Sequence, residues 1–191
     1  MQADRPVMMP EDEVPFRLAQ LLLLLKAVTV QDENGATLER IGYYDFLSAN
    51  PFLVVPPEGR EASLLRLAGF DPQVLAYASS SQRFTSRRER IQHDLALLVA
   101  YGCCRVHNRN GSLAYSITGI GQELGGKFTA TYATSFSAAA DIVVRQLRKL
   151  SDKRLREQTA QWISPDSPGN PAAALMAVLG PGPESEISWE G

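Results

Sequence analysis

The side chains of this sequence best suited to binding a ligand are arginines gathered in the middle of the chain. Between Arg83 and Arg109, six arginines stand against only two acids, Glu89 and Asp94, so this stretch carries a charge of +4. A guanidinium group donates paired hydrogen bonds to a phosphate, a carboxylate or a guanine base. The clustering therefore predicts contact with double-stranded DNA or with an acidic protein surface.

The candidate binding residues belong to two predicted elements, an amphipathic helix and the hairpin that follows it. The helix carries Arg83, Arg87, Arg88, Arg90, Gln92 and His93, and the hairpin carries Arg105, His107, Arg109 and Asn110. Residues 127–156 carry +5 and the tail after Ile163 carries −4, and the net charge of the chain is −2. Because the whole chain is slightly acidic, its charge does not decide whether the partner is DNA or a protein. A solvated helix face, or one that docks on another protein, is the alternative to DNA contact.

A segment with glycines and a lysine resembles a nucleotide-binding loop but lacks the residue that would bind Mg²⁺. Residues 121–127 (GQELGGK) have the spacing of a phosphate-binding loop, but the next residue is Phe128. Such a loop needs Ser or Thr at that position to hold Mg²⁺, and it follows a strand of a parallel sheet that this sequence does not predict. We interpret the segment as a helix that begins at Thr118 and ends at the glycine pair.

The thiols, imidazoles and carboxylates do not form a metal or catalytic pattern either. A four-ligand zinc site would use both cysteines and both histidines, at a spacing that fits none of the usual motifs. Cys103 and Cys104 are adjacent and are predicted to be reduced, buried side chains. Asp45 and Glu123 lack a partner for acid–base work, and Asp45 is expected to face solvent or a partner protein. The sequence thus predicts no enzyme, no cofactor and no metal.

The elements that position these residues begin with two apolar helices. The run Phe16–Val28 predicts a core helix, because its strongly apolar part is much shorter than the roughly 20 residues of a membrane span. After the Asn34-Gly35 turn, Ile41–Asn50 predicts a second helix that stops at Pro51. The bulky side chains of this helix are expected to dock on a partner; they are Tyr43, Tyr44 and Phe46.

The middle of the chain predicts helices separated by short polar segments. Ser63–Ala68 and Pro72–Ala78 are expected to be helical, and Ser79–Gln82 is expected to be a linker. Thr85 or Ser86 can cap the arginine-rich helix, which should run to about Tyr101 with Ile91, Leu95, Leu98 and Val99 on its apolar face. Two alternating segments around Asn110-Gly111 then predict a β-hairpin.

The C-terminal part predicts further helices and then a polar tail. Thr118 should cap one helix, and Ser137–Trp162 should form one or two more. The expected fold is α+β and mostly helical: a winged helix-turn-helix domain with a β-hairpin wing and C-terminal helices. We expect an N-terminal arm at 1–15, the winged-helix-like domain with its appended helices at 16–163, and a Pro/Gly-rich acidic tail at 164–191. The acidic N-terminus does not resemble a signal peptide, which favours the cytoplasm.

Three segments resemble one known protein family. These are IGYYDFLSANPFLV, RRERIQHDLALLVAYG and the hairpin end SLAYSITGIG. They resemble the middle component of bacterial ABC-three-component systems, which include the small subunit of Lamassu-type anti-phage and anti-plasmid defence complexes. The resemblance extends over about 16–163 and rests on aromatic and aliphatic patterns. The acidic arm and the Pro/Gly-rich tail depart from the family pattern.

The resemblance implies an accessory role in a heteromeric complex. Such a subunit joins an SMC-like ABC ATPase, which senses foreign DNA, to an effector that is commonly a nuclease. The alternative is a dimeric winged-helix transcription regulator that reads DNA with Arg87, Arg88 and Arg90. A hydrolase with an unrecognised site is a more distant third hypothesis. A neighbouring gene for a large SMC-like ATPase would favour the first, and a lone gene beside a divergent operon would favour the second.

Overall fold

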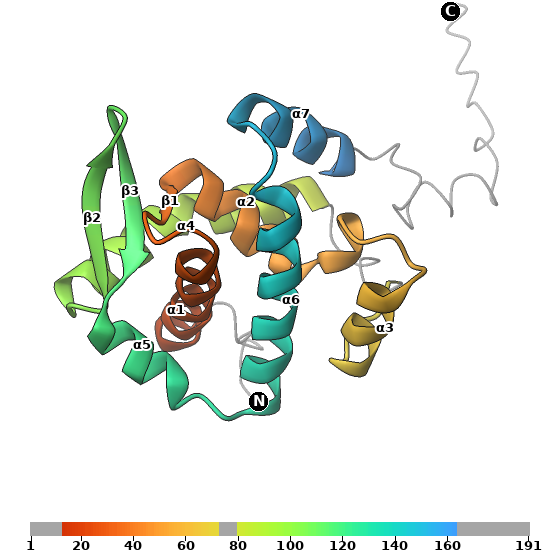
Figure 1. Ribbon diagram of the computed structural model, residues 1–191, viewed down its shortest axis with the longest axis horizontal. Helices are drawn as coiled ribbons and strands as arrows, with labels where there is room; N and C mark the ends of the chain where they lie inside the picture. The colour runs from red at the N-terminus through yellow and green to blue at the C-terminus, as the bar shows by residue number, and fades with distance from the viewer. Residues whose placement is uncertain (1–12, 73–79, 164–191) are drawn as a thin grey trace, which may run out of the picture.

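The computed structural model describes residues 13–72 and 80–163, of which 80–89 and 163 are described by their backbone alone. The order of elements is α1 (Val14–Gln31), β1 (Ala36–Thr37), α2 (Leu38–Ala49), the 3-10 helix η2 (Pro51–Leu53), α3 (Arg60–Leu67), α4 (Ser80–Ala100), β2 (Cys104–Arg109), β3 (Ser112–Ile117), α5 (Gly119–Gly126), α6 (Thr131–Leu147) and α7 (Asp152–Ile163). These elements confirm the predicted α+β, mostly helical class (Figure 1). The predicted helix over 72–78 lies almost wholly outside the described residues.

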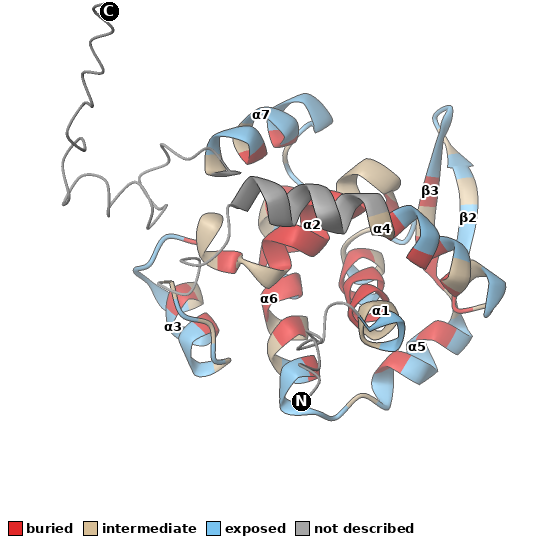
Figure 2. Cartoon of the chain, turned by 180° about the vertical axis from the view of Figure 1, so that it is seen from behind, coloured by how far each residue is buried: buried red, intermediate tan, exposed pale blue. Residues whose placement is uncertain are grey.

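Helix α1 is the centre of the core. Leu21 to Leu25 are all at most 5% exposed, because α4, α5, α6 and β3 surround the helix (Figures 1 and 2). By length and composition alone α1 could cross a membrane, but the core helix of a globular protein meets the same criteria. Here its leucines pack against the other helices, as predicted for a core helix.

Helix α2 packs between α4 and α6, and the structure corrects its predicted role. Its N-cap Thr37 accepts a hydrogen bond from the Arg40 backbone amide. Every residue from 41 to 48 is buried, including Tyr43, Tyr44 and Phe46. The prediction that these three rings dock on a partner is therefore wrong: apolar contacts on both sides of the helix draw them into the core.

Helix α4 begins at Ser80, so the predicted linker over 79–82 is helical from residue 80 onward. Thr85 and Ser86 lie inside this helix rather than at its cap. The segment from Ser80 to Ser86 contains neither Gly nor Pro, and several serines alone do not stop a helix that is already packed at its other end. The predicted buried face is present in the second half, where Ile91, Leu95 and Leu98 are buried.

In the described part of the chain, β1, β2 and β3 form an antiparallel sheet in the order β1-β3-β2. The predicted hairpin is confirmed: Arg109 pairs with Ser112 across a two-residue turn in which Asn110 and Gly111 have φ of 52° and 82°. Positive φ at both turn positions gives a twist that matches the flanking strands. Strand β1 was not predicted, because two residues are too few to show an alternating pattern.

Among the described residues, α5, α6 and α7 complete the structure around α1 and α2. Thr118 caps α5 by accepting a hydrogen bond from the Gly121 amide, as predicted. Helix α6 lies along α1 and α2, and it also covers α3 through a small second cluster that includes Leu65 and Ile142. Helix α7 lies at the periphery, with Leu155 buried against the core (Figure 1).

Candidate interaction surface

The predicted helix residues occupy α4, whose described half has one buried and one exposed face. Gln92 and His93 are exposed, and Arg90 is half-buried. The side chains of Arg83, Arg87 and Arg88 lie outside the described part of the structure, although their backbone is helical. The opposite face packs on α1 and α2, so in the described half of α4 the face with Gln92 and His93 is the one open to another molecule.

An ion pair that the sequence did not indicate fixes α4 against α1. Arg17 donates to both carboxylate oxygens of Asp94, at 2.9 Å and 3.1 Å. The Asp94 side chain is only 4% exposed. A buried carboxylate requires such a partner, because its desolvation costs several kcal/mol when it stands alone. Arg17 thereby sets how α4 presents its outer face.

Three of the predicted hairpin residues lie on one face of the sheet, and the fourth lies in the turn. Side chains alternate along β2, so Arg105, His107 and Arg109 share one face. Arg105 is exposed and donates from Nε to Ser116 Oγ at 3.0 Å, His107 is half-buried, and Asn110 is exposed in the turn. The predicted basic group is thus collected on one side of the wing-like hairpin.

Arg109 turns inward and binds the loop that precedes β1. Its guanidinium donates to Asp32 Oδ2 at 2.8 Å and to the Gly35 carbonyl at 3.0 Å. Burial alone would raise the pKa of Asp32, but hydrogen bonds from Arg109 and the Asn34 backbone lower it below its usual value. Arg109 therefore anchors the hairpin. Its partner Asp32 lies 77 residues earlier in the chain, so no local sequence motif predicts the contact.

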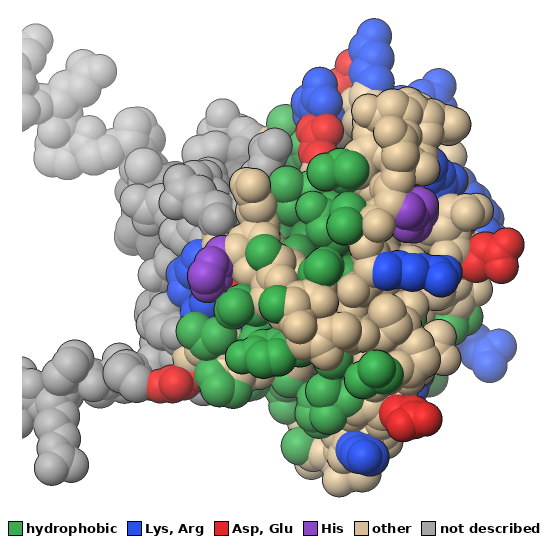
Figure 3. Space-filling model, turned by 90° about the vertical axis from the view of Figure 1, so that its left-hand side faces the viewer, with side chains coloured by type: hydrophobic (Ala, Val, Ile, Leu, Met, Phe, Trp, Pro, Cys, Tyr) green, Lys and Arg blue, Asp and Glu red, His purple; other side chains and the backbone are tan. Residues whose placement is uncertain are grey.

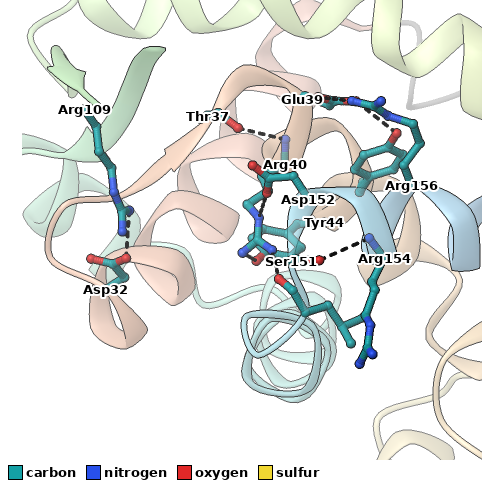
Figure 4. A network of polar contacts seen from close by, with 12 residues as sticks. Asp32, Thr37, Glu39, Arg40, Tyr44, Arg109, Ser151, Asp152, Arg154 and Arg156 are labelled. Atoms are coloured by element: carbon teal, nitrogen blue, oxygen red, sulfur yellow. Dashed lines mark hydrogen bonds and ion pairs between the residues drawn. The ribbon is translucent and has the colours of Figure 1, made fainter. Parts of the chain in front are cut away.

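A polar cleft of about 580 Å³ opens beside this anchor, between the hairpin, α2 and the start of α7 (Figure 4). Arg40 donates to Asp152 at 2.7 Å, to the Tyr44 hydroxyl at 3.1 Å and to the Leu150 carbonyl. Arg148 donates to the Gln31 carbonyl at 3.3 Å. The guanidinium groups of the cleft are thus largely engaged in holding neighbouring elements together.

The buried polar residues of the core serve packing, which corrects the expectation for Asp45. Asp45 is 6% exposed and accepts a hydrogen bond from Gln20 Nε2 at 2.7 Å, while the Tyr132 hydroxyl donates to Gln20 Oε1 at 2.7 Å. The prediction that Asp45 faces solvent or a partner is wrong, because α2 is buried on all sides rather than on one.

The glycine-rich segment forms a helix rather than a loop around a ligand. Gly121 lies in α5, where a Cβ would come within 2.2 Å of the Cys103 carbonyl oxygen. Lys127 is exposed at the end of the helix. The close approach of α5 to the start of β2 accounts for Gly121, and the helix ends at the glycine pair, with Lys127 as its C-cap.

The two cysteines are buried and free. Burial raises the pKa of the Cys104 thiol to about 11. Because the thiolate is the reactive form, we expect iodoacetamide to modify Cys104 in the folded protein very slowly at pH 8. The rate measured by mass spectrometry should rise toward pH 11, and full reactivity at pH 8 in the folded state would contradict the buried, protonated thiol.

The described residues define a helix-rich α+β protein, in which the predicted binding residues lie on α4 and on the hairpin. A family model, that of the ABC-three component (ABC-3C) system Middle Component 2, matches residues 71–165, a range that includes α4, the hairpin and α5 to α7. This match assigns residues 71–165 of the chain to that family, as the sequence motifs predict. No curated protein and no solved structure matches the chain.

Proposed function

We propose that the chain is a non-catalytic, winged-helix accessory subunit that joins an SMC-like ABC ATPase to an effector in a bacterial defence system. The observation that carries the proposal is the order of elements, in which α1, β1 and α2 are followed by α3, α4 and the hairpin of β2 and β3, with β1 on the far side of the hairpin in the sheet order β1-β3-β2. In a winged-helix domain, a helix in the place of α4 reads a groove and the hairpin is the wing. The match to a middle-component family supports a role in a multi-component system.

The contacts of the ionisable groups support an accessory rather than a catalytic role. Asp94 is paired with Arg17, and Asp45 is bound to Gln20 inside the core. The Cys104 thiol is protonated at neutral pH. Catalysis needs such groups in an accessible cleft with a matched partner, whereas here they stabilise the packing of helices.

Direct DNA contact would use the outer face of α4 together with the wing. Gln92 and His93 are exposed on α4, and Arg105 is exposed on the wing next to His107. Arg87, Arg88 and Arg90 precede them on the same helix. This arrangement can follow a phosphate backbone, and in the assembled complex it would add to the DNA binding of the ATPase.

Charge reversal on α4 tests this role. In the complex purified with the ABC ATPase of its own system, Arg87→Glu, Arg88→Glu and Arg90→Glu together should weaken DNA binding and flatten its salt dependence by about one unit per lost phosphate contact. Co-purification with the ATPase should persist. The matched control is reversal of three exposed cations elsewhere, Lys149, Lys153 and Arg154.

The other outcomes separate the alternatives. Loss of co-purification would assign the arginines to an acidic surface of the ATPase instead of to DNA. Unchanged DNA binding and unchanged assembly would leave them as a solvated helix face and contradict the proposal for α4. Tight, sequence-specific binding of DNA by the isolated chain as a dimer would favour the transcription regulator, whose winged-helix arrangement is the same.

A further inference from the structure

Strand β2 forms an edge of the sheet, and its outward backbone groups can be assigned. The Thr118 amide donates to the Cys103 carbonyl at 3.0 Å, so hydrogen-bonded pairs continue at Arg105, His107 and Arg109. The amides and carbonyls of Cys104, Val106 and Asn108 therefore point away from β3. Consistent with this alternation, the Ile117 amide, opposite Cys104, bonds outward to Thr29 Oγ1 at 3.2 Å.

Among the described residues no strand pairs with this side of β2. An open edge six residues long, without proline or a bulge, is a template for a further strand. Natural proteins usually cover or interrupt such an edge, and added strands are a common mode of peptide recognition. The edge is therefore open to an added strand.

The two faces beside the edge differ in chemistry, and this difference specifies the occupant. On one face Val106 is 42% exposed and Leu113 is 58% exposed. On the other face lie Arg105 and His107, with Arg109 held by Asp32. Figure 3 views this side of the molecule, where hydrophobic side chains gather between the chain's two histidines. A strand added here should alternate apolar and acidic residues.

The C-terminal segment of this chain has that alternation. In Glu184–Glu190 (ESEISWE), Ile187 and Trp189 occupy odd positions, and Glu184, Glu186 and Glu190 occupy even positions. In an extended strand these two sets project to opposite faces. The acids match the basic face of β2, and the two apolar residues match the face with Val106 and Leu113.

We propose that Glu184–Glu190 adds to the edge of β2 in the same molecule as a fourth strand of the sheet. Ile187 and Trp189 cover Val106 and Leu113, and the glutamates line the face with Arg105 and His107. The 20 residues between Ile163 and Glu184 can span roughly 65 Å when extended, whereas a folded domain of this size is on the order of 40 Å across. The tail is therefore long enough to reach the edge of β2. This proposal is independent of the defence role.

Hydrogen exchange of the β2 amides, measured by NMR, tests the proposal on the full chain. The amides of Val106 and Asn108 point outward, and they should exchange at least about tenfold more slowly in the full chain than in a chain ending at Pro183. The amides of Arg105, His107 and Arg109 are the internal controls, because their bonds to β3 protect them in both chains. The slowing should not depend on protein concentration, since the added strand comes from the same molecule.

Two variants sharpen the test. Val106→Pro removes an outward amide without removing a hydrogen bond to β3. It should therefore abolish the slower hydrogen exchange of the Asn108 amide in the full chain, while the control amides stay protected. Reversal of Glu184 and Glu186 to Lys should reduce the slowing, and Arg105→Glu in that background should restore part of it. The proposal is overturned if Val106 and Asn108 exchange equally fast in both chains, or if the slowing appears only at high protein concentration.

Discussion

Replacement of Arg17 by methionine should lower the free energy of unfolding by about 3 kcal/mol, or roughly 10 °C in Tm for a domain of this size. The Asp94 carboxylate is 4% exposed and takes both of its charged hydrogen bonds from Arg17, so the substitution leaves a buried charge without its counter-ion. Methionine retains the apolar stem, so the loss measures the missing guanidinium. Urea unfolding followed by circular dichroism measures it.

The matched control is Arg154→Met, because Arg154 is exposed at the start of α7. It should change stability by less than about 0.5 kcal/mol. The double variant Arg17→Met with Asp94→Leu should recover most of the stability, since it removes both charges together. If Arg17→Met costs no more than Arg154→Met, then the ion pair does not hold α4 on α1.

The second large effect is expected at Gly35, in the turn that leads into β1. Its φ is 67°, and a Cβ there would come within 1.9 Å of the Tyr115 carbonyl oxygen. Gly35→Ala should therefore lower the free energy of unfolding by about 3 kcal/mol or more, because it combines left-handed strain with a clash against backbone that cannot rotate away. Urea unfolding gives the value.

Gly111 provides a control that separates the cost of a positive φ from the cost of the steric clash. It has a φ of 82°, but a Cβ there would meet nothing within 4 Å. Gly111→Ala should therefore cost only about 1 kcal/mol, the typical penalty for a side chain in the left-handed region. Equal losses for the two substitutions would show that β3 can move away from Gly35 and that the contact is soft.

The features that could be predicted from the sequence are those fixed by local chemistry. The Asn110-Gly111 turn requires two positive φ values, and Thr118 caps the next helix by its own hydroxyl, so both appear where they were expected. The apolar run within α1 has no polar face that could meet solvent, so the prediction that this helix lies in the core was also correct. These patterns need no knowledge of distant residues.

The predictions from the sequence are wrong or missing where contacts between residues far apart in the chain determine the structure. Tyr43, Tyr44 and Phe46 look like an exposed aromatic face until α4 and α6 pack on both sides of α2. The roles of Asp94 and Arg109 depend on partners 77 residues away in the chain, Arg17 and Asp32. Strand β1 exists because β3 offers it an edge, and its two residues have no pattern of their own.

The attachment of α7 makes its position sensitive to ionic strength. Arg40 binds Asp152, and Arg156 binds both oxygens of Glu39, across a surface open to water (Figure 4). Counter-ions screen exposed pairs of this kind within a Debye length of about 8 Å under physiological conditions. The leucines of α1 have no such dependence, because burial of apolar groups does not weaken as counter-ions accumulate. Rising salt should therefore weaken the polar contacts of α7, whereas buried Leu155 and the leucines of α1 keep their apolar contacts.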